Sequence, residues 1–264
     1  MTEQSPAPLA ALPDIPGKPA SGHTEQLLRS LTFIAIWSLF TLLWACLCLI
    51  LCWLPYPGRY YLISRWNIVT IWLLETVCHI RYRIKGLENI PDGRVIILAK
   101  HQSAWETIFM LAHLKRPVAF VLKKELLFIP FFGWTLGLLR MIPIDRSNKT
   151  RAFRQLVALG NRRLKQGLCI IIFPEGTRIA PGKKGTYQQG GTLLAVKTGA
   201  HIVPVAHNAG EYWPKNTFIK KPGQITLSIG TAIAPDNRTP GELIRQVENW
   251  IETEMRNISP HHYR

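Results

Sequence analysis

A histidine and a glutamate stand at a spacing that suits proton transfer. Four residues separate His101 from Glu106 in the segment KHQSAWE, residues 100–106. Where a strand ends before the histidine and a helix begins after it, a carboxylate in the first helical turn can accept the Nδ1 proton of the imidazole. The second ring nitrogen, Nε2, is then left as a base. A structural histidine that is satisfied by a carboxylate would show the same spacing, so further residues must support the catalytic interpretation.

Polar residues also follow two other apolar runs of the sequence. Asp145 and Arg146 come directly after one run, and the turn sequence FPEGTR occupies residues 173–178 after another. In open α/β sheets the ligand crevice lies outside the carboxyl ends of the strands. The three strand ends are therefore predicted to bring His101, Arg146 and the Glu-Gly-Thr-Arg turn to one edge of a sheet.

Missing motifs disfavour other reaction types. The sequence contains no Gly-x-Ser-x-Gly elbow and no Gly-x-Gly-x-x-Gly, and Gly182-Lys183-Lys184 lacks the Ser or Thr that completes a phosphate loop. The five cysteines form no Cys-x-x-Cys pair and are interpreted as reduced packing residues. We therefore expect neither a metal site nor a cofactor.

The elements that must position these residues alternate along the chain. Strands are predicted at residues 95–99, 117–122, 142–145, 169–173, 202–206 and 225–229, and helices at residues 104–114, 132–139, 148–166, 191–198 and 240–258. The strands are β-branched or aromatic runs, and the segments between them have helical periodicity. This alternation predicts an α/β domain over residues 81–264, with a central, largely parallel or mixed sheet flanked by helices.

The N-terminal part has a different character. Residues 31–54 contain no charge, and a helix of this length, about 36 Å, crosses a bilayer core with some tilt. Pro55, Pro57 and Gly58 are predicted to end it. A shorter apolar run at residues 66–80 indicates an amphipathic or re-entrant helix beside the first, or alternatively a helix of the soluble core. We thus predict a membrane-associated segment at 25–80 and a flexible tail at 1–24.

The charge distribution points to an anionic partner. The chain has 32 Lys and Arg against 16 Asp and Glu, a net charge of +16, and the first 80 residues are balanced. The surplus on residues 81–264 suits nucleic acid, anionic lipid or a phosphorylated substrate. Six basic residues lie in the predicted helix 148–166, either as a solvated face or as a contact for anionic lipid or an acidic carrier protein. Because basic residues accumulate after the apolar run, the positive-inside rule favours an inner-membrane protein with a cytoplasmic domain.

Four ordered blocks together resemble the glycerolipid acyltransferases. They are His101-x-x-x-x-Glu106, the segment IDR at 144–146, FPEGTR at 173–178 and IVPV at 202–205, behind an apolar N-terminus. The resemblance covers about residues 80–235 and implies an α/β acyltransferase domain docked on the membrane by N-terminal helices. The sequence departs from the family at Glu106, where Asp is usual, and at Arg140, where the second block usually has Gly.

The resemblance implies a reaction and roles for the site residues. An acyl group would pass from a thioester, of coenzyme A or acyl carrier protein, to the 2-hydroxyl of 1-acylglycerol 3-phosphate (lysophosphatidic acid) and give phosphatidic acid. His101 would act as the base and Glu106 would orient it. Arg146 and Arg178 would hold the phosphate, while the turn Glu175-Gly176-Thr177 would line the acceptor site and face the oxyanion.

Two other interpretations remain open from the sequence. A related acyltransferase would act on glycerol 3-phosphate or another lysophospholipid, because the blocks are shared. A membrane-anchored protein without catalysis would use the basic surface to bind anionic lipid or nucleic acid. The second interpretation gives no reason for His101, Glu106 and Arg178 to stand at strand ends, so their placement favours an acyltransferase. We therefore expect a lipid partner and no nucleic acid. Acyl-chain preference and oligomeric state are not encoded in any motif.

Overall fold

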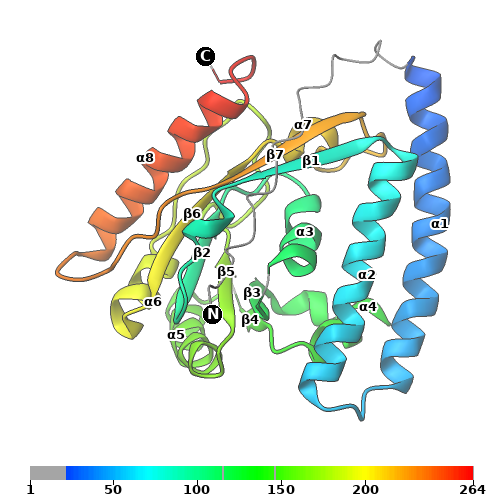
Figure 1. Ribbon diagram of the computed structural model, residues 1–264. Helices are drawn as coiled ribbons and strands as arrows, with labels where there is room; N and C mark the ends of the chain where they lie inside the picture. Colours follow the sequence, from blue (N-terminus) through cyan, green and yellow to red (C-terminus); the bar gives the residue numbers. More distant parts are fainter. Residues whose placement is uncertain (1–21, 115, 146, 264) are drawn as a thin grey trace, which may run out of the picture.

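The computed structural model describes residues 22–114, 116–145 and 147–263. A seven-stranded mixed sheet lies at its centre (Figure 1). In chain order the strands are β1 (Ile80–Lys85), β2 (Val95–Ala99), β3 (Val118–Lys123), β4 (Ile142–Ile144), β5 (Cys169–Ile172), β6 (His201–His207) and β7 (Gly223–Ile229). Their order in space is β1-β7-β6-β2-β5-β3-β4. Neighbours pair in parallel except β6 and β7, which are antiparallel. The predicted α/β fold is confirmed.

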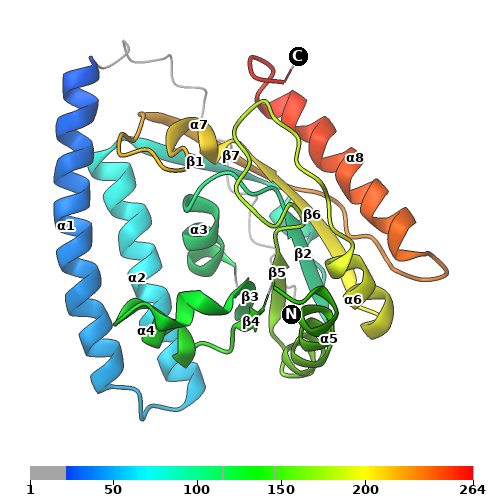
Figure 2. The same ribbon diagram turned by 180° about the vertical axis from the view of Figure 1, so that it is seen from behind.

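Helices cover both faces of the sheet. One face carries α3 (Trp105–His113) and α2 (Tyr56–Val77), with α1 (His23–Ile50) outside α2, and the other carries α5 (Lys149–Lys165), α6 (Gly190–Thr198) and α8 (Pro240–Ile258) (Figures 1 and 2). Alternate residues of β2 enter two separate hydrophobic clusters: Val95 and Ile97 on the α3 face, Ile96 and Leu98 on the α8 face. Burial on both faces explains why the central strands are continuous apolar runs.

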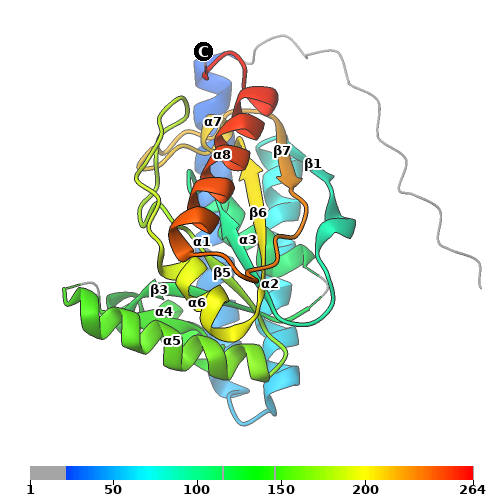
Figure 3. The ribbon, with the colours of Figure 1, turned by 90° about the vertical axis from the view of Figure 1, so that its left-hand side faces the viewer.

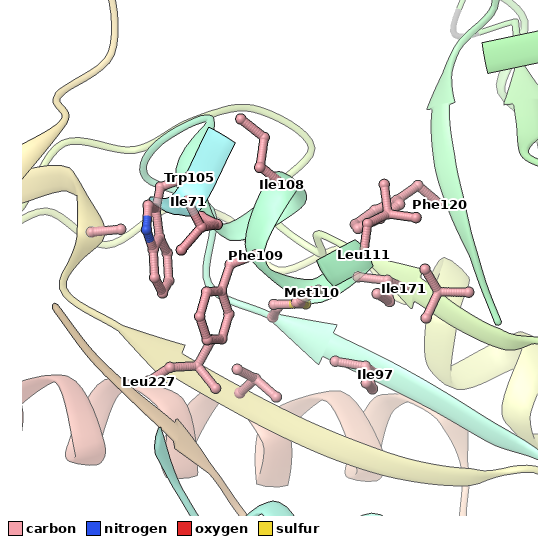
Figure 4. Packing of buried hydrophobic residues seen from close by; sticks show 14 of the residues in the cluster. Ile71, Ile97, Trp105, Ile108, Phe109, Met110, Leu111, Phe120, Ile171 and Leu227 are labelled. Carbon is pink, nitrogen blue, oxygen red and sulfur yellow. The ribbon is translucent and has the colours of Figure 1, made fainter. Parts of the chain in front are cut away.

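Helix α3 fixes the start of the site because its apolar side packs on the sheet. Trp105, Phe109 and Met110 are buried, and in Figure 4 they lie over Ile97 of β2 and Leu227 of β7. Trp105 and Phe109 stack with ring centroids 4.2 Å apart. The helix therefore begins at a fixed place, directly after the loop that carries residues 100–104.

The first two helices form an antiparallel hairpin that packs on the domain. Indole nitrogens tie the pair together: Trp37 Nε1 donates to Thr70 Oγ1 (3.2 Å), and Trp66 Nε1 donates to Thr41 Oγ1 (3.0 Å). The second helix begins ten residues before the predicted run. Pro57 lies in the first turn of α2, where proline favours a helix start, so it does not merely end α1.

Strand β1 is absent from the sequence-based expectation. The predicted apolar run 66–80 continued to Ile80, but α2 ends at Val77 and a strand starts at Ile80. Its sequence IRYRIK alternates apolar and basic residues, which is the period of a half-buried strand. Three short helices, η1 (Leu87–Asn89), η2 (Lys124–Phe128) and α7 (Ala209–Tyr212), and helix α4 (Phe132–Leu138) complete the described chain.

The hairpin leaves a broad apolar surface. Within the described residues, α1 is the one helix whose length and composition suit a membrane crossing. Exposed apolar side chains run along it and continue at the turn into α2: Leu28, Leu31, Leu39, Leu43, Ile50 and Trp53. The predicted tail 1–24 lies outside the described residues apart from residues 22–24, and α1 begins at His23.

Candidate active site

His101 stands at the carboxyl end of β2, one residue beyond Lys100. Its Nδ1 lies 2.7 Å from Glu106 Oε1 in the first turn of α3. Because a carboxylate accepts, Nδ1 carries the proton and Nε2 has a free lone pair in the neutral ring. The side chain is 19% exposed, and Nε2 has no hydrogen-bond partner among the described residues. The geometry therefore leaves a base that solvent or substrate can reach.

Glu106 is fully buried and held by the loop that precedes it. Its Oε1 accepts from the backbone N–H groups of Gln102 and Ser103, both at 3.0 Å. Burial opposes the ionisation of this carboxyl. The interactions with the His207 and His101 imidazoles and these hydrogen bonds outweigh burial, and together they hold the pKa of Glu106 below its ordinary value. Glu106 therefore stays a carboxylate, with its orientation fixed.

A second contact fixes the plane of the imidazole. The ring of Phe173, at the end of β5, stacks on His101 with centroids 3.9 Å apart and an angle of 11° between planes. Strands β5 and β2 are neighbours in the sheet. Phe173, the first residue of the FPEGTR segment, thus orients the His101 ring, while Glu106 keeps the proton on Nδ1.

Glu175 points into the protein and holds the turn against His101. Its Oε2 accepts from the backbone N–H of His101 (3.0 Å), and its Oε1 accepts from Lys100 Nζ (2.7 Å) and Gly185 N–H (3.2 Å). Burial raises the pKa of Glu175 even though Lys100 acts against it. The contacts give this residue a positioning role next to the base.

The rest of the turn faces outward. Gly176 has φ +69°, a left-handed conformation that glycine adopts without strain, and its N–H donates to Phe173 O (3.0 Å). That donor is thus engaged in this structure. Thr177 is exposed and Arg178 is half-buried. Among the described residues no carboxylate pairs with Arg178, so its guanidinium is open to an anion.

Arg146, the other predicted phosphate ligand, lies outside the described residues. Its neighbour Asp145 is described, and its carboxylate accepts from the backbone N–H of Ser147 at 3.0 Å. Lys215, which the sequence did not single out, places its Nζ 3.4 Å from Thr177 Oγ1. It adds a second cation beside Arg178.

Several residues of the site were missed by sequence reasoning. Lys100 is fully buried and bridges two carboxylates, Glu175 Oε1 at 2.7 Å and Glu252 Oε1 of α8 at 2.8 Å. Tyr187 also donates to Glu252 (2.8 Å). A lysine inside the motif was the one available signal, since a buried lysine needs a carboxylate partner. The identity of that partner, 152 residues away, has no local signature.

A second buried histidine lies behind Glu106. His207 Nε2 donates to Lys100 O (2.8 Å), Nδ1 accepts from Ala209 N–H (3.3 Å), and Nε2 is 3.9 Å from Glu106 Oε2. These partners require the neutral ring. Burial lowers the pKa of His207 below its ordinary value of 6.5. His207, the last residue of β6, thus joins that strand to the loop at Lys100, and His101 remains the accessible imidazole.

The arrangement suits direct transfer and not a covalent intermediate. Ser103, the hydroxyl nearest in sequence to His101, is buried and donates to Trp213 O (2.6 Å). Cys169 is buried in β5 and burial raises the pKa of its thiol to about 12. The backbone N–H of Ile179, next to Arg178, donates to His101 O (2.8 Å), so the two segments are in contact. An imidazole with an open Nε2 can deprotonate a hydroxyl, and a guanidinium without a described carboxylate partner can bind an anionic substrate.

Comparison with known proteins places this geometry in a family. The Acyltransferase family model matches residues 81–208. A 1-acyl-sn-glycerol-3-phosphate acyltransferase from Pseudomonas aeruginosa is 43% identical over 242 residues, which cover 90% of this chain and 94% of the relative. The chain therefore belongs to the acyltransferase family, which confirms the resemblance read from the four blocks.

Two further relatives widen the comparison. A protein from Chlamydomonas reinhardtii, also a 1-acyl-sn-glycerol-3-phosphate acyltransferase, is 29% identical over 67% of this chain and 54% of its own length. The crystal structure of PlsC, the 1-acyl-sn-glycerophosphate (LPA) acyltransferase of Thermotoga maritima, superposes with a TM-score of 0.74. It is 27% identical, with 89% of this chain and 96% of that chain covered. The mixed sheet and its helices are thus shared with a solved acyltransferase.

Proposed function

We propose that this acyltransferase moves an acyl group from a thioester to the 2-hydroxyl of 1-acylglycerol 3-phosphate, giving phosphatidic acid in phospholipid synthesis. The observation that carries the proposal is the His101–Glu106 pair, with its 2.7 Å contact and accessible imidazole. The segment of Arg178, with which no described carboxylate pairs, contacts His101 through the Ile179 N–H. The Pseudomonas relative, similar over nearly all of both chains, supports the choice of acceptor.

In the proposed mechanism His101 is both base and acid. Its Nε2 takes the proton of the acceptor hydroxyl as the oxygen attacks the thioester carbonyl. The tetrahedral intermediate then collapses to the ester, and the departing thiolate takes the proton from the imidazolium. The Glu106 carboxylate stabilises the imidazolium between these steps. Such acid–base catalysis contributes about 10²–10⁴ in rate, and the thioester is already activated, so the scheme uses no cofactor.

The acceptor phosphate is proposed to bind at the exposed side of the turn. Arg178 offers a planar fork that matches two phosphate oxygens, and Arg146 is kept as its proposed partner. Lys215 adds charge at the same turn. Glu175 acts from inside, because it holds the turn to His101. Thr177 and the glycine at 176 are proposed to line the acceptor site and to face the oxyanion that forms there.

Membrane association fits an amphiphilic acceptor. The exposed apolar side chains of α1 are proposed to contact lipid at the cytoplasmic face of the inner membrane, where the basic domain attracts anionic substrate. The acyl donor is proposed to be acyl-coenzyme A or acyl carrier protein. Both carry the same thioester, so one catalytic scheme serves either donor.

The test is acyl transfer in membranes that carry the full-length protein. Labelled acyl-coenzyme A and acyl carrier protein are supplied with 1-acylglycerol 3-phosphate, and phosphatidic acid is measured for wild type and His101→Ala. We expect product with wild type and a loss of about 10²–10⁴ with His101→Ala. Lys184→Met is the control. It removes a surface lysine that pairs with Glu248, and it is expected to keep activity.

Alternative acceptors decide between related functions. Product from glycerol 3-phosphate or another lysophospholipid, and none from 1-acylglycerol 3-phosphate, would move the protein to another acceptor class. Full activity in His101→Ala would refute the mechanism. No transfer under any condition, with retained binding to anionic lipid, would favour the binding-protein interpretation.

A further inference from the structure

Three arginines surround Tyr56 at the start of α2. They come from separate elements: Arg59 from the first turn of α2, Arg140 from the segment before β4, and Arg163 from the end of α5. The Arg140 guanidinium lies 3.9 Å from the centroid of the Tyr56 ring. The charges of all three arginines act on the Tyr56 phenol. Arg140 is also the residue at which the sequence departs from the family's second block.

The positive charges in this cluster have no counter-charge in the described part of the chain. Among the described residues no carboxylate forms an ion pair with Arg59, Arg140 or Arg163. Burial, followed by the positive charges of Arg162 and Arg140, lowers the pKa of Arg163. Like charges held together without a counter-ion repel each other, and the strength of that repulsion rises as water is excluded. Such an arrangement is stable in the presence of an anion.

Polar atoms in the cluster are also left without partners. The Tyr56 hydroxyl, Arg59 Nε and Arg163 Nε are shielded from solvent and make no hydrogen bond within the described structure. Arg163 Nη1 does donate to Gln166 Oε1 at 3.2 Å, so the guanidinium is anchored while its Nε stays free. A buried donor without an acceptor destabilises the fold until a ligand supplies the acceptor. These donors fit the oxygens of a phosphate group.

The cluster lies at the opposite edge of the sheet from His101. The Tyr60 hydroxyl, one turn beyond Tyr56, accepts from the N–H of Val118, the first residue of β3. Arg140 precedes β4, and Arg163 precedes β5. These strands run parallel to β2, whose carboxyl end carries His101. The cluster is therefore separate from Arg178, the described residue that is proposed to hold the acceptor phosphate.

Its surroundings indicate a lipid surface. Ile50 and Trp53 lie at the turn between α1 and α2, shortly before Tyr56 in the chain. Their exposed fractions are 71% and 73%. Figure 3 shows this turn and the C-terminal end of α5 at the same end of the molecule. Exposed tryptophan beside arginine is the combination found where apolar side chains enter a bilayer and cations meet headgroups.

We propose that Tyr56, Arg59, Arg140 and Arg163 form a second phosphate site, which binds the headgroup of an anionic membrane phospholipid. The site goes beyond the proposed reaction, since it is remote from His101. Its role is to fix the hairpin turn and the amino edge of the sheet to the bilayer surface.

The test uses the full-length protein in neutral detergent, titrated with phosphatidylglycerol in mixed micelles. This lipid is neither substrate nor product of the proposed reaction, so the result is independent of that function. The readout is the rise in thermal midpoint with lipid concentration, from which an apparent Kd follows. We expect Arg140→Gln and Arg163→Gln each to weaken binding by about fivefold. Tyr56→Phe keeps every charge and the stacked ring, and it is expected to weaken binding less.

Arg154→Gln is the matched control. It removes the same charge from the same helix, but residue 154 lies nine positions before Arg163, two and a half turns away, and so on the opposite face. We expect it to keep wild-type affinity. If Arg163→Gln does not fold, Arg140→Lys serves instead, because lysine keeps the charge and loses the planar fork.

Three outcomes would overturn the proposal. Equal weakening by Arg154→Gln would mean diffuse attraction to a basic surface. Wild-type affinity in both Arg140→Gln and Arg163→Gln would mean that the cluster binds no headgroup. An equal rise in thermal midpoint from sodium phosphate at the same phosphate concentration would mean a free anion site and no lipid site.

Discussion

The two edges of the sheet treat buried charge in opposite ways. At the carboxyl edge, Lys100 contacts two carboxylates and Glu106 contacts a histidine and two backbone N–H groups. At the amino edge, three arginines lie near Tyr56, and no described carboxylate forms an ion pair with them. Paired charges fix the geometry of the loop that carries them, whereas unpaired positive charges are complementary to an anionic ligand. The difference separates residues that hold the loop of His101 from residues that are proposed to bind a phosphate.

The largest effect is expected where a buried pair is broken. Lys100→Met leaves Glu175 and Glu252 facing each other without their cation. Removing one partner of a buried ion pair costs about 3–5 kcal/mol, and the FPEGTR turn should loosen with it. Chemical denaturation measures the loss. Lys184→Met, on the surface, is the control and should leave the midpoint where it was. A wild-type midpoint for Lys100→Met would mean that the charge cluster does not hold the edge together.

A smaller effect is expected at the open side of the turn. Arg178→Gln removes a guanidinium that has no described carboxylate partner, so folding should not suffer. A charge-assisted hydrogen bond to phosphate is worth about 1.5–3 kcal/mol, which corresponds to a rise of about 10- to 100-fold in KM for the acceptor. Steady-state kinetics with the acceptor varied at saturating donor gives the value. A fall in kcat at unchanged KM would place Arg178 in the chemical step.

The carboxyl edge should also respond to pH through His207. Burial keeps its pKa below the ordinary 6.5, so the unfolded chain binds a proton more readily than the folded one. Its contribution to stability is therefore full above pH 6.5 and is lost as pH falls towards the folded pKa. The slope is at most about 1.4 kcal/mol per pH unit. Thermal midpoints between pH 7.5 and 5 should fall more for wild type than for His207→Gln. The exposed His262→Gln is the control, and equal slopes for wild type and His207→Gln would count against a buried neutral ring.

The smallest effect, and the sharpest contrast with Lys100, is expected at the amino edge. Without lipid, Arg163→Gln relieves repulsion from Arg140 and Arg162. Its thermal midpoint should equal or slightly exceed that of wild type. The corresponding change in the free energy of unfolding should be within about 0.5 kcal/mol. A loss as large as that of Lys100→Met would show that Arg163 is paired in the folded protein, and the contrast between the two edges would fail.

Local patterns in the sequence predicted much of the fold and the pair at its centre. Short apolar runs marked β2, β3, β5, β6 and β7 closely, because central strands are buried on both faces. The contact between His101 and Glu106 followed from their spacing across a strand end and a helix start. Both features depend on residues that are neighbours in the chain.

The remainder depends on partners that are distant in sequence. Lys100 meets Glu252 across 152 positions, and no spacing rule connects them. Strand β1 was merged with the helix before it, although Ile80, Tyr82 and Ile84 alternate with basic residues. The direction of β7 against β6 is set by the connection through α7, which leaves no mark in the sequence. Likewise, the arginines near Tyr56 come from three elements and converge only after folding.

The pairing of β1 with β7 has a consequence for synthesis of the chain. β1 is an edge strand whose neighbour in the sheet is β7, and their register joins Ile80 to Gly223. The ribosome therefore delivers the apolar hairpin and β1 long before the strand that receives them. During that interval the hairpin must shelter in lipid or with a chaperone, because its side of the sheet is incomplete. A chain that stops before residue 223 would expose an unpaired strand edge, a known starting point for aggregation. Early capture of the nascent hairpin by the membrane would thus serve folding as well as placement of the finished enzyme.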